Sequence, residues 1–193
     1  MTHSDRSAPL YRGPTRTILV VDDSRTALAV LGRRLGWLGY LPVMCDNGAD
    51  ALDHVATQRF DLVLTDLVMP GMSGLQLLRA LRSSPETRDR PLIVLTGRSD
   101  PAAAIDALAA GADDHVAKPF DFDVLAARIE RVIGHAQRLA DLRKSNAALD
   151  ARIAERAMAL GEAETELAAT RADRQRLVAS LQALNDRVEQ AGC

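Results

Sequence analysis

Acidic side chains follow two of the short apolar runs in the first two thirds of the sequence. Asp22 and Asp23 come directly after one run, and Asp66 stands shortly after another. Three carboxylates that converge in a crevice of low dielectric repel one another, and they stay ionised together only beside a compensating cation. Hard oxygen ligands of this kind suit a divalent ion, so we expect the three residues to form a Mg²⁺ site.

Two further polar side chains end apolar runs of the same kind. Thr96 ends one run and Lys118 ends another. An ammonium group and a hydroxyl beside a bound metal ion suit a phosphoryl group, whose oxygens accept hydrogen bonds from both. The residue types therefore predict phosphoryl chemistry beside an oxygen-ligated metal ion.

A parallel sheet would bring these residues together. Five apolar runs alternate with stretches of helical spacing, and the first four are apolar throughout, which indicates strands buried on both faces. The alternation predicts an α/β fold with a five-stranded parallel, doubly wound sheet. Such sheets bind ligands beyond the carboxyl ends of their strands, where the polar residues stand. The five runs are Ile18–Val21, Leu41–Cys45, Leu62–Leu64, Leu92–Leu95 and His115–Ala117.

Helix-start signals agree with this alternation. Ser99-Asp100-Pro101 places a cap before a proline at the first helical position, and Asp121 or Asp123 could open the last helix of the segment.

Residues 17–137 resemble the receiver domain of a two-component response regulator. The resemblance implies the flavodoxin-like form of the sheet, and it makes Asp66 the acceptor of a phosphoryl group from a histidine kinase or phosphotransfer protein. The only enzymatic activity it implies is Mg²⁺-dependent self-phosphorylation from a phosphodonor, followed by autodephosphorylation. The motifs that carry it are Val20-Val21-Asp22-Asp23, Asp66 through Gly74, Thr96-Gly97, Gly111-Ala112-Asp113-Asp114 and Lys118-Pro119-Phe120.

The same resemblance gives each site residue a role. Asp23 and Asp66 would bind Mg²⁺ together with the backbone carbonyl of Val68, and Asp22 would help through water. Lys118, aimed by a cis peptide bond to the following proline, would pair with a phosphoryl oxygen. Thr96 would turn its hydroxyl onto the phosphoryl group and carry the signal outward.

Two departures from the family pattern bear on signalling. His115 stands three residues before the lysine, where the family usually has a Tyr or Phe that rotates inward on activation. It could rotate and titrate near neutral pH, or it could be an exposed polar residue of the outer strand. Val68 and Arg98 would flank the path of the hydrolytic water, and because an apolar side chain cannot orient that water, we expect slow autodephosphorylation. Val68 also stands where an aspartyl-phosphoenzyme hydrolase would need its second carboxylate, which argues against that class.

The C-terminal third has a different period. Starting at Val132, an apolar spacing of three and four residues continues for eight heptads without a proline, which is typical of a coiled-coil seam. No aromatic residue lies beyond Phe122. As a helix, residues 139–191 would span roughly 80 Å at about 1.5 Å per residue. We therefore expect this helix to pair with a second copy; the alternative is a single, frayed amphipathic helix.

Polar residues of this seam indicate a parallel homodimer. Asn146 at an a position fixes register in parallel pairs, and Glu166 at g can pair with Arg171 at the following e position. Arg156 and Arg174 weaken the seam. We expect a switch in which phosphorylation changes the register or closure of the coil.

Composition excludes several other functions. The chain of 193 residues has 24 basic and 26 acidic residues, and this net charge of −2 argues against nucleic-acid binding. It has no apolar run of 18 residues, so no membrane span is expected. Cys45 and Cys193 make no disulfide framework, which favours the cytoplasm.

We expect a flexible tail over 1–16, a receiver domain over 17–137 and a coiled-coil helix over 138–193.

The predicted function is a phosphorylation-dependent regulator that contacts an unknown downstream protein through its dimeric coil. The alternative is a receiver and linker from a larger regulator with a diguanylate cyclase or histidine kinase output, because Asn146–Leu160 resembles signalling-helix linkers. His135 could be a kinase-like phosphoacceptor, but it lacks the acidic neighbour of such a motif, and a partly exposed helix residue is the favoured interpretation.

Overall fold

The computed structural model of the protein describes residues 15–97 and 101–191, with side chains up to residue 183. By their contacts, the residues form two compact units, one that ends at Leu139 and one that begins at Ala140. The predicted tail and the cap at Ser99-Asp100 lie largely or wholly outside the described residues. In the part of the chain that is described, no helix combines the length and hydropathy that a membrane span requires.

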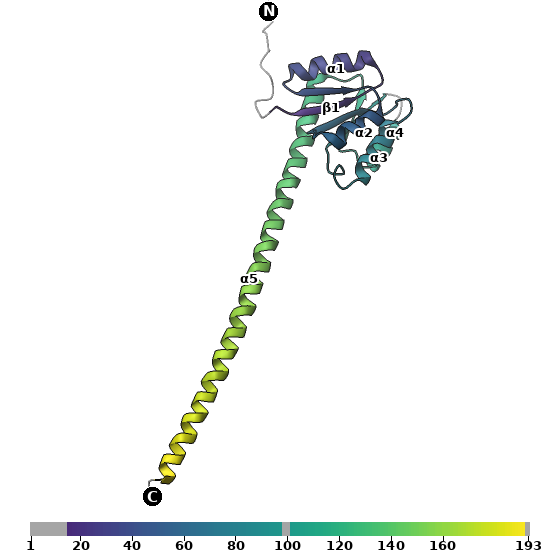
Figure 1. Cartoon of the computed structure of the whole chain (residues 1–193). Coiled ribbons are helices and arrows are strands. Elements are labelled where there is room, and N and C mark those ends of the chain that lie inside the picture. The colour runs from purple at the N-terminus through teal and green to yellow at the C-terminus, as the bar shows by residue number, and fades with distance from the viewer. Residues whose placement is uncertain (1–14, 98–100, 192–193) are drawn as a thin grey trace, which may run out of the picture. The chain divides into compact units, whose positions relative to one another are not determined.

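The first unit is built on a five-stranded parallel sheet with the strand order β2-β1-β3-β4-β5 (Figure 1). This confirms the predicted fold class. The strands are β1 (Thr17–Val21), β2 (Leu41–Cys45), β3 (Leu62–Asp66), β4 (Leu92–Gly97) and β5 (Asp114–Lys118).

Helices follow the strands in strict alternation. Several begin at polar caps: the side chain of Ser24 accepts a hydrogen bond from the backbone N–H of Ala27, and Ser73 forms a capping box with Gln76. The carboxylate of Asp121 accepts hydrogen bonds from the N–H groups at the start of the last helix. The helices are α1 (Arg25–Trp37), α2 (Gly48–Thr57), α3 (Gly74–Ser83), α4 (Pro101–Ala109) and α5 (Phe122–Ala191).

Apolar residues on both faces of the central strands form two cores. One face packs against α1 and the first turns of α5, and the other packs against α2, α3 and α4. In β1, for example, Ile18 and Val20 belong to the first core, and Leu19 and Val21 belong to the second. This explains why the run is apolar without alternation.

The prediction of burial on both faces was wrong for β2. This strand lies at the edge of the sheet and pairs only with β1. Leu41 is 56% exposed, and only Cys45 of its five residues is buried. Pro42, which cannot donate a backbone hydrogen bond, is tolerated at such an edge.

Polar contacts fix the first turns of α5 to the sheet. The hydroxyl of Tyr40 donates to Glu130 at 2.7 Å. On another side, Arg128 and Arg131 donate to Asp114, the first residue of β5, at 2.9 and 2.7 Å. Burial opposes the charge of Asp114, but these hydrogen bonds outweigh it and lower the pKa of the carboxyl.

The second unit is the continuation of α5, in which every described side chain from Ala140 to Ala183 is exposed. The apolar stripe predicted from Val132 has a different beginning, because Val132 is 3% exposed and packs in the receiver core. The exposed stripe begins at Leu139. Its large apolar members at a and d positions are Leu139, Leu142, Leu149, Ile153, Leu160, Leu167, Leu177 and Leu181, which are 41–67% exposed.

Candidate functional site

Three carboxylates meet at the carboxyl edge of the sheet. Asp22 and Asp23 follow β1, and Asp66 is the last residue of β3; because β1 and β3 are paired neighbours, their ends coincide. Each carboxylate offers an oxygen, and these oxygens lie within 4.8 Å of one another. Asp22 is buried and Asp23 is exposed. The cluster could hold a metal ion, and its hard oxygen donors fit a divalent cation of the Mg²⁺ or Ca²⁺ kind.

Lys118 joins two of these carboxylates. Its ammonium nitrogen lies 2.7 Å from an oxygen of Asp22 and 2.9 Å from an oxygen of Asp66. Burial opposes the charge on Lys118, but the hydrogen bonds and charges of the two carboxylates outweigh it and raise the pKa of the ammonium. The peptide bond between Lys118 and Pro119 is cis, as the resemblance implies. The lysine is therefore a cation held between Asp22 and Asp66.

At Asp66, unlike at Lys118, burial outweighs the charged neighbours. Burial is the largest influence and raises the pKa of its carboxyl, while the hydrogen bond and charge of Lys118 lower it less. The charge of Asp22 raises the pKa further. An additional cation would favour the ionised form of Asp66, which is the form that can act as a nucleophile.

The loop after Asp66 is held by two residues, Thr65 and Gly74, that had no predicted role. Gly74 lies so close to this loop that a Cβ there would collide with the backbone oxygen of Asp66, and its N–H donates to Leu67 at 3.0 Å. Thr65 is fully buried, and its hydroxyl donates to the same Asp66 oxygen at 3.0 Å. The available signal was a glycine at the first position of a helix, between the capping residues Ser73 and Gln76. A glycine weakens a helix, so its presence at this position indicates that another part of the backbone approaches closely.

The remaining predicted residues occupy neighbouring strand ends. Thr96 is 2% exposed, and it is paired with Ala117 one residue before Lys118. His115 lies on β5 opposite Val94, and it is half-buried. Its Nδ1 atom is buried without a hydrogen-bond partner among the described residues.

Three other residues named from the sequence do not join this cluster of side chains. Val68 is 75% exposed, so only its backbone could serve the acidic cluster. His135 is exposed on α5. Arg98 lies outside the described residues.

A family model for the response regulator receiver domain matches residues 18–130, which is more than half of the chain. The chain belongs to this family. It is the receiver domain of a two-component response regulator, as the motifs predict, followed by a long helix.

Curated relatives of this receiver agree with the family assignment. Response regulator MprA of Mycobacterium sp. (strain KMS) is 40% identical over 116 residues, which cover 60% of this chain and 50% of that protein. MprA of Mycobacterium avium (strain 104) gives the same identity and coverage. The chain thus spans about half the length of the curated relatives that it matches.

Solved receiver structures are similar to this one. The receiver domain of a signal transduction histidine kinase from Syntrophus aciditrophicus is 36% identical with a TM-score of 0.60, and the match covers 64% of this chain and 94% of that one. The receiver domain of a sensor histidine kinase from Pseudomonas aeruginosa PAO1 is 30% identical with a TM-score of 0.59, and the match covers 63% and 99%. The latter structure has a magnesium ion coordinated in its active-site cleft.

Proposed function

We propose that this protein is a phosphorylation-dependent response regulator whose Asp66 accepts a phosphoryl group from a histidine kinase or phosphotransfer protein. The observation that carries the proposal is the position of the Asp66 carboxylate, which lies within reach of two other carboxylates and 2.9 Å from Lys118. This arrangement provides a nucleophile, a cation for the transferred group and oxygen ligands for a metal ion. Phosphoryl transfer is catalysed mainly by such positioning and charge.

Mg²⁺ is the ion that we assign to the acidic cluster. Asp23, Asp66 and the backbone carbonyl of Val68 would hold it, and Asp22 would help through water. When bound, the ion supplies positive charge that neutralises phosphoryl oxygens during transfer. The magnesium ion in the related Pseudomonas aeruginosa receiver supports this assignment.

The chain's own residues perform the transfer as follows. A carboxylate oxygen of Asp66 attacks phosphorus, the bond between phosphorus and the imidazole nitrogen of the donor breaks, and the electron pair stays on that nitrogen. Lys118 already donates to Asp66, so a small movement of its ammonium group brings it onto a phosphoryl oxygen. Thr96, at the neighbouring strand end, donates its hydroxyl to another oxygen and so reports the modification to β4 and α4.

Phosphorylation with an acyl phosphate as donor tests this proposal. With Mg²⁺ present, intact mass spectrometry should show one added phosphoryl group on the wild type and none on Asp66→Asn. A chelator should abolish the reaction. Asp53→Asn, which changes an exposed aspartate of α2, is the matched control and should be modified like the wild type. Equal phosphorylation of Asp66→Asn would refute the assignment of the acceptor.

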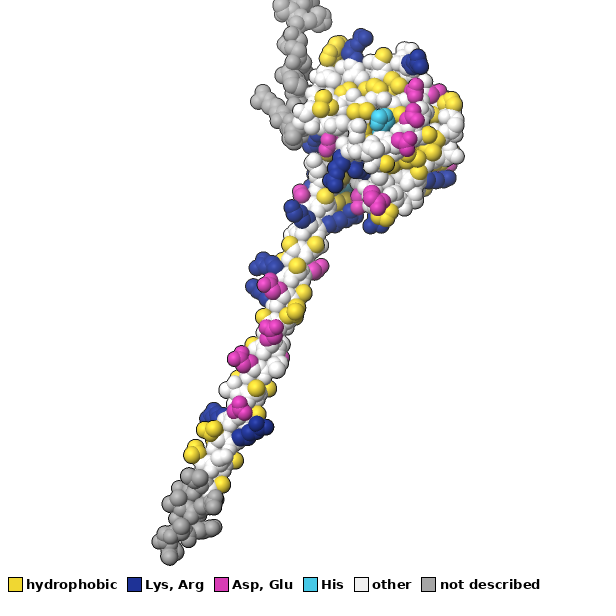
Figure 2. All heavy atoms as spheres, in the orientation of Figure 1, with side chains coloured by type: hydrophobic (Ala, Val, Ile, Leu, Met, Phe, Trp, Pro, Cys, Tyr) yellow, Lys and Arg dark blue, Asp and Glu magenta, His cyan; other side chains and the backbone are white. Residues whose placement is uncertain are grey.

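We further propose that the output is a parallel homodimer formed by α5, which contacts an as yet unknown downstream protein. The support is the stripe of large apolar residues at coiled-coil positions, all of which are solvent-exposed on a single chain. Figure 2 shows hydrophobic side chains along the helix between charged ones. Sedimentation of the full chain tests this: a dimer is expected, and a monomer at all concentrations would refute it.

A further inference from the structure

Acidic and basic side chains lie on opposite flanks of the apolar stripe in one segment of α5. In the heptad that places Leu167 and Arg174 at a, Glu166 and Asp173 precede them at g, and Arg171 lies at e on the opposite flank. All five side chains are exposed. The segment therefore has an acidic flank, a basic flank and an arginine within the stripe itself.

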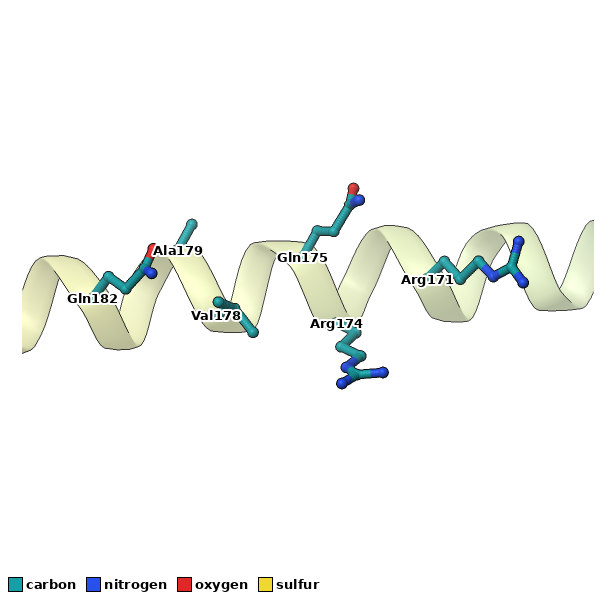
Figure 3. A pocket seen from close by; sticks show the side chains of 6 residues that line it. All are labelled: Arg171, Arg174, Gln175, Val178, Ala179 and Gln182. Carbon is teal, nitrogen blue, oxygen red and sulfur yellow. The ribbon is translucent and has the colours of Figure 1, made fainter.

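Next to Arg171, six side chains line a shallow depression on the helix surface. Half of them stand at b and f positions, on the outer face of a coiled coil. Figure 3 shows the six side chains. In this view Arg174 extends away from the helix axis, while Arg171 lies along the helix. The residues that line the depression are Arg171, Arg174, Gln175, Val178, Ala179 and Gln182.

The two arginines of this segment lack an intramolecular partner among the described residues. In the described part of the chain, neither Arg171 nor Arg174 forms an ion pair. Asp173 lies 3.7 Å from Arg176, but these side chains are 76% and 84% exposed. A pair so open to water is weak and can exchange partners. The segment thus offers two guanidinium groups and two carboxylates for intermolecular contacts.

We propose that a second copy of this chain pairs with this segment in a parallel arrangement and in register, with its Glu166 on Arg171 and its Asp173 on Arg174. In a parallel coiled coil, a g residue faces the e residue five positions later on the other helix, and it also flanks the a residue that follows it. Twofold symmetry makes each contact occur twice. The inference rests on the proposed homodimer and names the residues that set its direction and register.

The alternative direction loses this complementarity within the segment. An antiparallel pair centred on the same residues would place g opposite g, which brings Glu166 against Asp173 of the other chain. Arg174 also favours the proposed arrangement, because a charged a residue destabilises a seam unless a partner carboxylate neutralises it. Asn146, two turns into the coil, would fix the same register through its counterpart on the other chain.

Charge reversal of one flank at a time tests the proposal with the full chain. Glu166→Lys with Asp173→Lys makes both flanks basic, and Arg171→Glu with Arg174→Glu makes both flanks acidic. Each double variant alone should dimerise with a Kd raised about tenfold or more, because every attractive contact becomes repulsive. A mixture of the two should form heterodimers that native mass spectrometry separates by mass.

Two controls accompany these variants. Glu155→Lys with Glu162→Lys makes the same change of charge at c positions, away from the predicted interface, and should leave the Kd unchanged. Direction is tested with Leu177→Cys in a Cys193→Ser background. Parallel, in-register helices bring the two introduced thiols together, so a disulfide-linked dimer should form, whereas Cys193→Ser alone should form none.

The outcomes separate this inference from the proposed function. A wild-type chain that stays monomeric overturns both the homodimer and the arrangement of its flanks. A wild-type dimer that both charge-reversed variants also form, with unchanged Kd and no preference for the mixture, leaves the homodimer standing and refutes the assigned contacts. Absence of the Leu177→Cys disulfide from a stable dimer refutes the parallel register. Heterodimers from the mixture together with that disulfide establish the inference.

Discussion

Magnesium should raise the melting temperature of the receiver, and Asp66→Asn should remove most of this effect. The expectation follows from the three carboxylates whose oxygens lie within 4.8 Å. A ligand that binds only the folded state stabilises it by about 2.7 kcal/mol at roughly 100 times its Kd. For a domain of this size, about 1 kcal/mol shifts the melting temperature by roughly 4 °C. The wild type should therefore gain about 10 °C.

The same variant should behave differently without metal. Burial raises the pKa of Asp66, so the ionised carboxyl is disfavoured in the folded state relative to the unfolded chain. An acid whose pKa is raised by folding contributes stability that is present below its unfolded pKa and lost as the pH rises through the folded pKa. At neutral pH, Asp66→Asn should thus be at least as stable as the metal-free wild type. Lys118 keeps Asp22 as a partner in the variant.

Differential scanning fluorimetry of the full chain measures both effects. Melting temperatures are recorded with Mg²⁺ and with chelator, from neutral pH down to about the usual pKa of an aspartate. Asp106→Asn, an exposed residue of α4, should respond to Mg²⁺ like the wild type. The metal-induced shift of the wild type should shrink as the pH falls through the raised pKa. Equal Mg²⁺ shifts in the wild type and Asp66→Asn, or a clear loss of metal-free stability in that variant, would refute the reasoning.

Three further predictions concern the loop and the helix around the site. Val68→Asn should shorten the lifetime of the phosphorylated protein, measured by loss of the added mass with time, because an amide can orient the hydrolytic water; an unchanged lifetime would dismiss that explanation. Gly74→Ala should destabilise the receiver by about 2 kcal/mol or more in urea unfolding, since the new methyl group collides with the Asp66 backbone. Tyr40→Phe should cost about 1.5 kcal/mol in the same assay, because it removes a 2.7 Å hydrogen bond to a carboxylate; an unchanged free energy of unfolding would refute the contribution of this hydrogen bond.

The strands and the acidic residues could be predicted because their signals are local. A run such as Leu92–Leu95 is apolar whether or not its neighbours are known, and aspartates at strand ends share one edge of any parallel sheet. The edge position of β2 could not be predicted in this way. Its residues Leu41–Cys45 are as apolar as those of a central strand, and only the order of the strands exposes them. Strand order depends on contacts between distant segments, which no local pattern records.

The supporting residues of the site were missed for a related reason. Thr65 and Gly74 act through the backbone of Asp66, one by a hydrogen bond and the other by the absence of a side chain. Both residue types are common in loops and strands without any function. Their importance arises from the distance between β3 and the start of α3, and that distance exists only in the folded chain.

In the proposed homodimer, helix α5 would serve both packing and output, and this limits how it can signal. Its first turns bury Leu125, Ile129, Val132 and Ile133 in the receiver core, while the same helix exposes its apolar stripe from Leu139 onward. Turning the whole helix to present another face would expose those four core residues, at about 1.5–3 kcal/mol for each. That total of about 6–12 kcal/mol exceeds the coupling of about 1–3 kcal/mol that is typical between two sites.

Opening or closing of the exposed stripe against a second chain leaves those four core residues buried. Polar and small side chains at Arg156, Ala163 and Thr170 make the middle of the predicted seam weak, so a coupling of this size can change whether it is closed. Phosphorylation should therefore alter the closure of the coil and leave the packing of Val132 intact. Crosslinks from cysteines at positions 142 and 181 should change in yield when a phosphate mimic binds, whereas hydrogen exchange at the start of α5 should not. Unchanged crosslinks with a disturbed core would instead establish rotation of the helix.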